Sequence, residues 1–142
     1  MKYALMFVAL LMTTVLLGAA AQSTMVVTYA DHDKVEKGGS LATAPDYTVS
    51  VLRRTSAGQV EVHEKETDIF YVVDGEATFV TGGTMIGGKV SRPNQLLGTD
   101  IQGGQTHRLT KGDVIVVPAG TPHWFKEVPQ LIRYFTVKSI KP

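Results

Sequence analysis

Short stretches of β-strand character recur along this chain from residue 47 onward, and they limit the fold more than any other feature. In each stretch, β-branched or aromatic residues alternate with polar residues or form a brief apolar run, as in half-buried or buried strands. Glycine or proline residues separate the stretches, and no segment has the apolar stripe of a helix long enough to cover a sheet. An all-β chain is therefore predicted, with strands at residues 47–54, 59–63, 69–73, 77–81, 106–109, 114–117, 123–126 and 131–137.

Two connections between these strands have distinct sequence signatures. Asp74 and Gly75 form a hairpin turn signal, after which residues 77–81 are expected to return as a strand. Residues 83–105 are rich in glycine and show no stable period, so we expect a long excursion without regular structure. Such an excursion could close over a ligand as a lid or pack on a neighbouring chain.

The first 21 residues resemble a secretory signal peptide. Lys2 supplies a positive charge, residues 4–17 are largely apolar, and Ala19 to Ala21 form the small-residue pattern that precedes cleavage. The apolar run is shorter than the roughly 20 residues that a membrane-spanning helix needs. We therefore predict a signal peptide at residues 1–21, a single domain at residues 22–142, a secreted or periplasmic location, and no stable membrane insertion after cleavage.

Charge and cysteine content exclude further classes. The 142-residue chain has 14 lysines and arginines and 13 aspartates and glutamates, and loss of Lys2 leaves the two charges equal in number. A chain without a basic excess is a poor candidate for binding nucleic acid. Because the chain has no cysteine, an exported domain must obtain its stability from a closed hydrophobic core, which favours a compact barrel or sandwich.

The segment before the first predicted strand contains an apolar patch and a charged run. Residues 25–27 (Met-Val-Val) could add a strand at an edge of the domain or offer an edge to a second copy. Residues 31–37 are mostly charged and end at Gly38-Gly39, so we expect a solvated surface segment, which could form one or two helical turns with a glycine stop. His32 lies between two aspartates, a pattern more typical of a solvated surface than of a cation site.

The stretch at residues 61–75 places three polar side chains among apolar ones. Strand parity puts Glu61 and His63 on one face, and it groups Asp68 with Phe70 and Val72. A carboxylate, an imidazole and a second carboxylate that converge among apolar residues form either a metal site or an unusually polar interior.

Residues 112–127, with the sequence GDVIVVPAGTPHWFKE, resemble the second motif of the cupin superfamily. That motif reads G-x5-P-x-G-x2-H-x3-N. Gly112, Pro118, Gly120 and His123 match it in spacing, and Glu127 stands where the family usually has asparagine. Its glycines and proline would turn a strand sharply while residues 114–117 stay in a buried run.

The earlier stretch resembles the first cupin motif, G-x5-H-x-H-x3 or 4-E-x6-G, with three departures. Glu61 stands at the first histidine, His63 matches the second, and Asp68 stands at the glutamate. Gly75 matches the final glycine, whereas Thr55 occupies the position of the leading one. The resemblance implies a single-domain cupin barrel, a double-stranded β-helix of the jelly-roll type, and a homodimer is a further expectation from it.

The resemblance also implies a metal site. In cupins, two histidines and a glutamate of the first motif and the histidine of the second bind one divalent metal, and these positions correspond to Glu61, His63, Asp68 and His123. The carboxylate of Glu61 adds a hard, negative ligand, which suits manganese or ferrous iron, with zinc or nickel as competitors. Asp68 is one methylene shorter than glutamate, so its strand must lie closer to the metal.

Two functions remain open. The first is an exported small cupin that binds a divalent metal and a small polar or carboxylate-bearing molecule in the barrel mouth. As an enzyme it would be a metal-dependent oxygenase, isomerase or lyase, with Glu61 or Glu127 as a base. The second is a metal-free, non-catalytic small-molecule binding or stress-related module, in which the same four side chains form a polar pocket. The fold does not choose between them.

Other side chains have weaker claims to a site. His107 shares a strand face with Leu109 and is more typical of a core or surface position than of a ligand. Parity directs Phe125 inward, and Glu127 with it. Five residues could contact a bound anion but are of types that more commonly pack or face solvent: Tyr71, Tyr134, Arg53, Arg54 and Arg133.

Overall fold

The computed structural model describes residues 26–141, so the predicted signal peptide lies outside the described residues. The first element is the helix α1 (His32–Lys37). The Asp31 side chain caps it by accepting a hydrogen bond from the Lys34 N–H at 2.9 Å, and the helix ends at Gly38. The sequence allowed a short helix in this solvated segment, and the helix forms with no buried residue. Within the described residues, no helix has the length and apolar character needed to cross a membrane.

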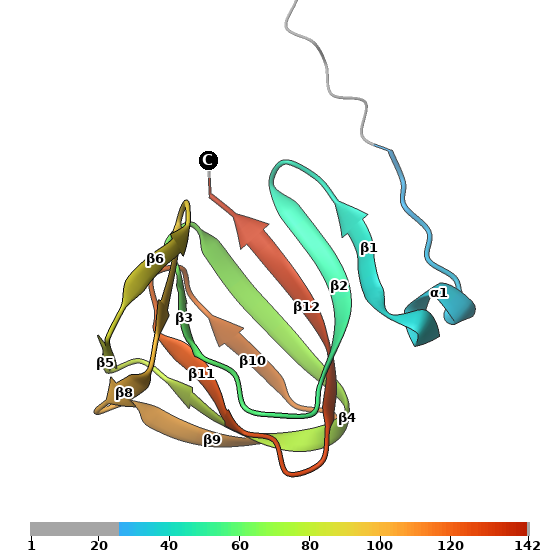
Figure 1. Cartoon of the computed structure of the whole chain (residues 1–142). Helices are drawn as coiled ribbons and strands as arrows, with labels where there is room; N and C mark the ends of the chain where they lie inside the picture. The colour runs from blue at the N-terminus through green and yellow to red at the C-terminus, as the bar shows by residue number, and fades with distance from the viewer. Residues whose placement is uncertain (1–25, 142) are drawn as a thin grey trace, which may run out of the picture.

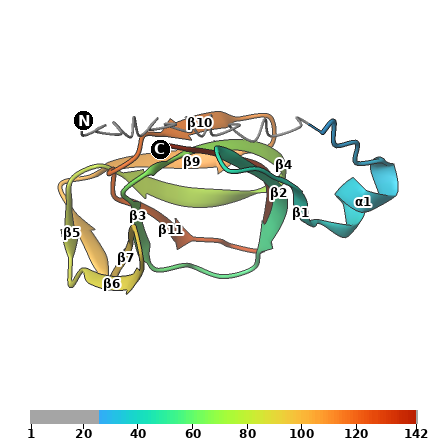
Figure 2. The same ribbon diagram turned by 90° about the horizontal axis from the view of Figure 1, so that it is seen from above.

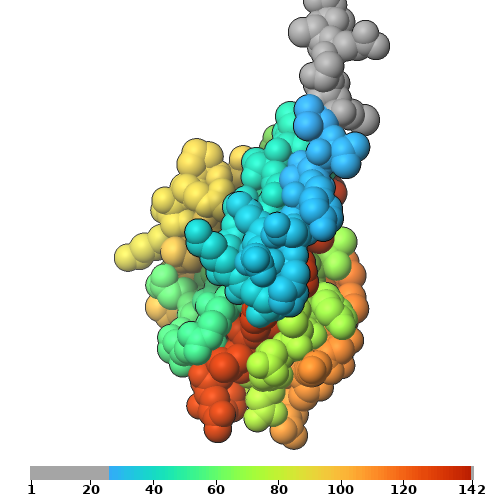
Figure 3. Space-filling model, turned by 90° about the vertical axis from the view of Figure 1, so that its right-hand side faces the viewer, coloured from blue at the N-terminus to red at the C-terminus, as the bar shows by residue number. Residues whose placement is uncertain are grey.

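The edge strand predicted at residues 25–27 is not formed by the two of these residues that the structure describes. Val26 and Val27 belong to no strand and are 76% and 93% exposed, while Met25 lies outside the described residues. A strand forms after the helix instead, at β1 (Gly39–Thr43), and it pairs with β2 (Tyr47–Arg54). The helix and β1 form much of one side of the molecule (Figure 3). The homodimer stays a prediction.

The strands form two antiparallel layers that share the long strand β4 (Glu66–Thr81), as Figures 1 and 2 show. The first layer has the order β1-β2-β12-β4-β10, and the second has the order β9-β4-β11-β3-β7-β6. Strands β5 and β8 form a separate ribbon. The predicted all-β barrel is therefore confirmed. The remaining strands are β3 (Val60–His63), β5 (Thr84–Ile86), β6 (Lys89–Arg92), β7 (Gln95–Gly98), β8 (Asp100–Gln102), β9 (Gln105–Thr110), β10 (Val114–Val117), β11 (His123–Glu127) and β12 (Ile132–Ile140).

Strand β4 is continuous, so the hairpin turn predicted at Asp74-Gly75 is wrong. The strand pairs with β12 up to Gly75 and with β9 from Glu76 onward, so it passes from the first layer to the second at this point. Gly75 has a φ of 76°, and a Cβ there would overlap the backbone carbonyl oxygen of Leu131. Glycine therefore permits a bend between layers rather than a reversal of the chain.

Residues 83–105 are not an irregular excursion, which corrects the second expectation about connections. They form the four short strands β5 to β8. Strand β7 pairs antiparallel with β3 and so extends the second layer beside Glu61 and His63. The segment is therefore part of the barrel wall next to the predicted site.

The core lies between the layers and is centred on four rings. Phe70 and Phe125 contact each other, and each also contacts Phe79 and Tyr134, with centroid distances between 4.6 and 5.9 Å. Such ring pairs each add about 0.5–1.5 kcal/mol beyond the burial of their area. The other members of the cluster are Val72, Ala77, Leu109, Val117, Val128 and Ile132.

Strand β10 is not the buried run that was predicted for residues 114–117. Val117 is buried, whereas Val114 and Val116 are 63% and 55% exposed. The strand pairs with β4 at one edge of the first layer, so its successive side chains alternate between the core and the outer face.

Candidate metal centre

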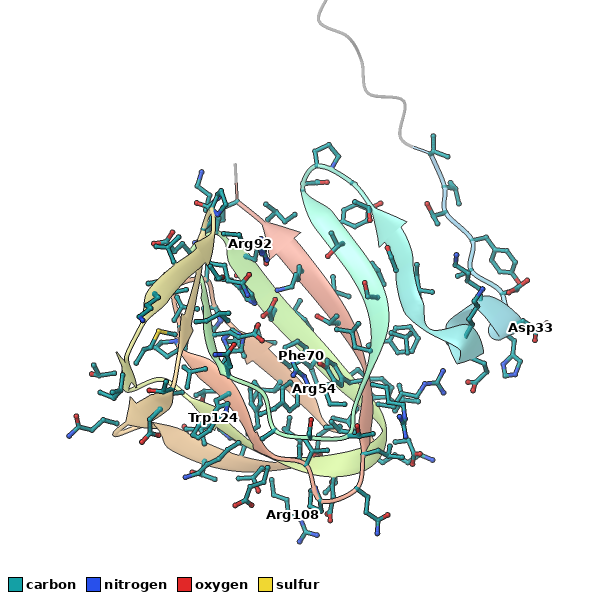
Figure 4. The ribbon with its side chains drawn as sticks, in the orientation of Figure 1. Asp33, Arg54, Phe70, Arg92, Arg108 and Trp124 are labelled. Atoms are coloured by element: carbon teal, nitrogen blue, oxygen red, sulfur yellow. The ribbon has the colours of Figure 1, made fainter. Side chains whose placement is uncertain are left out.

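A pocket lies between the two layers and contains about 380 Å³ of empty space, including its open mouth. Arg54, Phe70 and Trp124 mark its position in Figure 4. Polar and apolar side chains share the lining, which consists of Leu52, Arg54, Gln59, Glu61, His63, Asp68, Phe70, His123, Trp124, Phe125, Tyr134, Thr136 and Lys138.

The four residues predicted as metal ligands all line this pocket. Oδ2 of Asp68 lies 3.4 Å from Nε2 of His63 and 3.4 Å from Nε2 of His123. Oε2 of Glu61 lies 3.3 Å from Nε2 of His63. Asp68 and both histidines are buried, and Glu61 is half-buried. Three strands, β3, β4 and β11, therefore bring the four side chains together.

Backbone pairing explains the convergence. His123 is paired with Glu61 between β11 and β3, so these two side chains start from adjacent positions on one layer. The turn before β11 is fixed by the N–H of Gly120, which donates to the carbonyl oxygen of His63 at 2.8 Å. Asp68 approaches from the first layer. The shorter aspartate can thus reach the histidines across the space between layers.

The contacts of His123 indicate its protonation state. Its Nδ1 lies 3.0 Å from the carbonyl oxygen of Thr121, which can only accept, so the ring hydrogen is assigned to Nδ1. Burial lowers the pKa of His123 and favours the neutral ring at pH 7. Nε2 then has a lone pair and faces Oδ2 of Asp68 at 3.4 Å. Two buried acceptors therefore face each other, at a separation longer than the roughly 2.7–3.2 Å of N–H···O hydrogen bonds.

These spacings fit a bound cation. When ligand atoms lie about 2.0–2.2 Å from a metal, two of them are about 3.0 Å apart if the ligand–metal–ligand angle is about 90°. They are about 3.4 Å apart if the coordination is tetrahedral. The separations of 3.3 and 3.4 Å around Nε2 of His63 are of this size. Two overlapping groups have ligand atoms close enough for one ion, namely Glu61, His63 and His123, and His63, Glu66 and Asp68.

Glu61 is ionised in this environment. Burial on its own would raise the pKa of Glu61, but the hydrogen bond to His63 and the positive charge of Arg54 bring it to about 2. Nη2 of Arg54 lies 3.4 Å from Oε1 of Glu61. A carboxylate must be deprotonated to bind a metal, and Glu61 meets this condition at neutral pH.

Two charged side chains beside the site were not predicted from the sequence. Nζ of Lys138 lies 2.6 Å from Oδ1 of Asp68 and 2.9 Å from Oε2 of Glu66. The same Glu66 oxygen lies 3.5 Å from Nδ1 of His63. Burial acts to raise the pKa of Glu66, yet the ammonium of Lys138 holds it below its ordinary value. Two-residue steps along β12 from the buried Tyr134 would have indicated that Lys138 points inward.

Two other predicted candidates lie outside the pocket. Nε2 of His107 lies 2.9 Å from Oγ1 of Thr81, which gives it a structural partner. Glu127 does not join Phe125 inward, because a bulge between them shifts the register. Glu127 is exposed and accepts a hydrogen bond from Thr78 at 3.1 Å, so it is not placed to act as a base in the pocket.

The aromatic and arginine candidates divide between pocket and surface. Arg54 donates through Nε to the Tyr134 hydroxyl at 3.1 Å and lies 4.9 Å above the Phe125 ring. Trp124 also lines the pocket, and its Nε1 donates to the carbonyl oxygen of Gly58 at 2.8 Å. The remaining candidates are elsewhere: Arg133 is paired with Glu36 of α1, and Tyr71, Arg53 and His32 are exposed.

Comparisons with known proteins agree with this architecture. The family model described as Cupin matches residues 23–139. The cupin domain of Cnp3 from Schizosaccharomyces pombe superposes with a TM-score of 0.54 at 16% identity, over 73% of this chain and 60% of that chain. TT1209 from Thermus thermophilus superposes with a TM-score of 0.53 at 17% identity, over 82% of this chain and 100% of that chain. KdgF from Halomonas sp. superposes with a TM-score of 0.50 at 21% identity, over 74% of this chain and 80% of that chain.

At these identities the structural likeness shows the fold alone. The matched part spans about three fifths of the Cnp3 chain, 60%. No protein with a curated description gives a significant sequence match. The family match nevertheless extends over most of the sequence, from residue 23 to residue 139, and it includes both motif regions. The chain therefore belongs to the cupin family.

Proposed function

We propose that this chain is an exported cupin that binds one divalent metal through Glu61, His63, Asp68 and His123 and takes a small carboxylate-bearing molecule in the same pocket. The observation on which this rests is the pair of buried acceptors, Nε2 of neutral His123 and Oδ2 of Asp68, 3.4 Å apart. A cation between them would be bound by both lone pairs at once. Export is supported by the sequence of residues 1–21 alone.

The donor set favours particular metals. Two imidazoles combined with two carboxylates suit manganese or ferrous iron, and zinc or nickel can compete for such a site. A metal held there would supply Lewis-acid polarisation of an oxygen of the bound molecule. The chain itself contributes aromatic and apolar side chains to the pocket lining, among them Leu52, Trp124 and Phe125. This combination is compatible with a metal-dependent oxygenase, isomerase or lyase.

Metal content tests the proposal. The untagged mature protein, dialysed against Mn²⁺ and then desalted, should contain about one equivalent by elemental analysis, and a His63→Ala, His123→Ala double variant should contain only traces. The chain offers a matched control, His32→Ala, His107→Ala, which removes the two histidines outside the pocket and should retain the metal. Equal trace metal in all three folded proteins would contradict the proposal.

The charges of the pocket favour an anionic ligand. Two lining acids, Glu61 and Asp68, face two lining bases, Arg54 and Lys138. Glu66, behind Asp68, has Arg92 at 3.7 Å as a further partner. The lining charges thus cancel without a metal, and a divalent ion leaves an excess of positive charge that a carboxylate of the ligand can neutralise.

Ligand class can be tested with a matched pair of probes. Benzoate should raise the melting temperature of the Mn²⁺-loaded protein and change the emission of Trp124, the only tryptophan in the chain, whereas uncharged benzamide at the same concentration should do neither. A ligand at 100 times its Kd adds about 2.7 kcal/mol of stability. Equal responses to both probes would exclude charge as the basis of recognition.

One observation favours the second function, a metal-free binding pocket. The cancellation of charge between Glu61 and Arg54 and between Asp68 and Lys138 already satisfies the carboxylates in part. A protein of this kind would show trace metal in the elemental analysis and the same benzoate response with or without Mn²⁺. The two functions are thus separated by the same pair of experiments.

A further inference from the structure

We infer that Arg54 and Lys138 are positioning residues for the two carboxylate ligands, each holding the outer oxygen of one carboxylate so that a single oxygen faces the metal. This inference rests on the proposed metal site. Nζ of Lys138 lies 2.6 Å from Oδ1 of Asp68, while Oδ2 of the same group faces the two imidazoles at 3.4 Å. The two oxygens of Asp68 therefore have different partners.

Glu61 shows the same division between its oxygens. Nη2 of Arg54 lies 3.4 Å from Oε1, whereas Oε2 lies 3.3 Å from Nε2 of His63. The two cations come from different strands, β2 and β12, and the two carboxylates come from β3 and β4. The repeated arrangement at two separate carboxylates points to the metal site as the feature that the cations serve.

Arg54 is itself held firmly. Its Nε donates to the Tyr134 hydroxyl at 3.1 Å, and its guanidinium lies 4.9 Å above the Phe125 ring. The planar guanidinium can meet these partners and Glu61 at the same time, which a lysine ammonium cannot. Partners of metal ligands that are fixed in this way orient the ligand and adjust its affinity for the ion.

Arg54 also accounts for the tolerance of a glutamate at position 61. The cupin motif has an uncharged imidazole at this position, so Glu61 introduces a negative charge beside Asp68. The guanidinium offsets that charge without occupying the oxygen that faces His63. We therefore expect the role of Arg54 to depend on Glu61 and to disappear when a histidine replaces the glutamate.

Gly58 offers a second way to disturb Arg54. A Cβ at this position would lie 2.8 Å from Nη1 of Arg54, and no backbone atom would lie as close. Gly58→Ala should therefore push the guanidinium away from Glu61 while the fold persists. The variant keeps the arginine charge and changes only its placement.

A double-mutant cycle tests the inference through the Kd for Mn²⁺ and the EPR spectrum of the bound ion. Arg54→Met should weaken Mn²⁺ binding by about 10–100-fold and alter the spectrum, and Gly58→Ala should act in the same direction. In the Glu61→His background, Arg54→Met should change the Kd by no more than about twofold, which would show that the two positions are coupled. Lys138→Met should behave likewise, with an effect that is lost in an Asp68→Asn background.

The outcomes separate this inference from the proposed function. If the wild-type protein binds no Mn²⁺, both are overturned. If it binds Mn²⁺ and Arg54→Met binds as tightly, or loses affinity equally in the wild-type and Glu61→His backgrounds, only the positioning role is overturned. Far-UV circular dichroism and melting curves of every variant identify any that fails to fold. If Arg54→Met fails, Gly58→Ala, which keeps the arginine side chain, takes its place in the cycle.

Discussion

An Asp68→Asn variant is expected to bind Mn²⁺ more than about 100-fold more weakly than the wild-type protein, beyond the upper end of effects from residues that only support a ligand. Oδ2 of Asp68 lies 3.4 Å from Nε2 of both His63 and His123, so this oxygen is placed to bind the same ion as the two imidazoles. Asparagine keeps the shape of the side chain but replaces the charged ligand with a neutral amide. Competition with a metal-binding dye gives the two dissociation constants.

The matched control for this acid-to-amide change is Glu127→Gln. Glu127 stands at a motif position, yet it is exposed and accepts a hydrogen bond from Thr78, so its replacement should leave Mn²⁺ affinity unchanged. If Asp68→Asn bound Mn²⁺ within about threefold of wild type, Asp68 would be a structural partner of Lys138 rather than a ligand. The group formed by Glu61, His63 and His123 would then be the metal site.

A Gly75→Ala variant is expected to lower the free energy of unfolding by about 4 kcal/mol. A left-handed backbone conformation costs a residue with a Cβ roughly 1–2 kcal/mol. The new methyl group would also overlap the Leu131 carbonyl oxygen, a backbone atom that accepts the Glu76 N–H, and overpacking of this kind adds about 1–3 kcal/mol. Urea denaturation followed by circular dichroism measures the change.

Gly82→Ala separates the two contributions. Gly82 has a φ of 72°, close to the 76° of Gly75, but a Cβ there would meet no atom within 4 Å. Its replacement should cost only the backbone term, about 1–2 kcal/mol. Equal losses at the two glycines would show that the approach of Leu131 to β4 does not constrain Gly75, and the bend would then need another cause.

The sequence predicts the strands well where alternation extends over several residues. The strand at residues 47–54 is found with its bounds, and the short helix is indicated by its charged run and its glycine stop. The strands at residues 84–102 escape prediction because pieces of three or four residues are too short to establish a period. Asp74-Gly75 is misread because the same dipeptide suits a hairpin turn or a bend within a strand, and the choice depends on a distant residue, Leu131.

The residues of the candidate site can be predicted where short sequence patterns, such as strand parity and motif spacing, determine their positions. Parity and motif spacing find Glu61, His63, Asp68 and His123, which the fold brings to one pocket. Lys138 is missed because its link to Asp68 arises from the register between β12 and β4, 70 residues apart in sequence.

Glu127 is misplaced for a related reason. A bulge after Phe125 cancels the parity on which its prediction depended. Positions that depend on pairing between remote strands, or on one extra residue in a strand, are not encoded in any short stretch of sequence.

The pairing of His123 with Glu61 has a consequence for the energetics of ion capture. Within the described part of the chain, this is the one register position that joins β11 to β3, and both of its members are proposed ligands. Their proximity is set by main-chain hydrogen bonding before any ion arrives. The entropy lost in bringing these two ligands together is therefore lost on folding and not on metal binding. The apparent affinity for the metal ion should then exceed that of a site whose ligands lie on mobile loops.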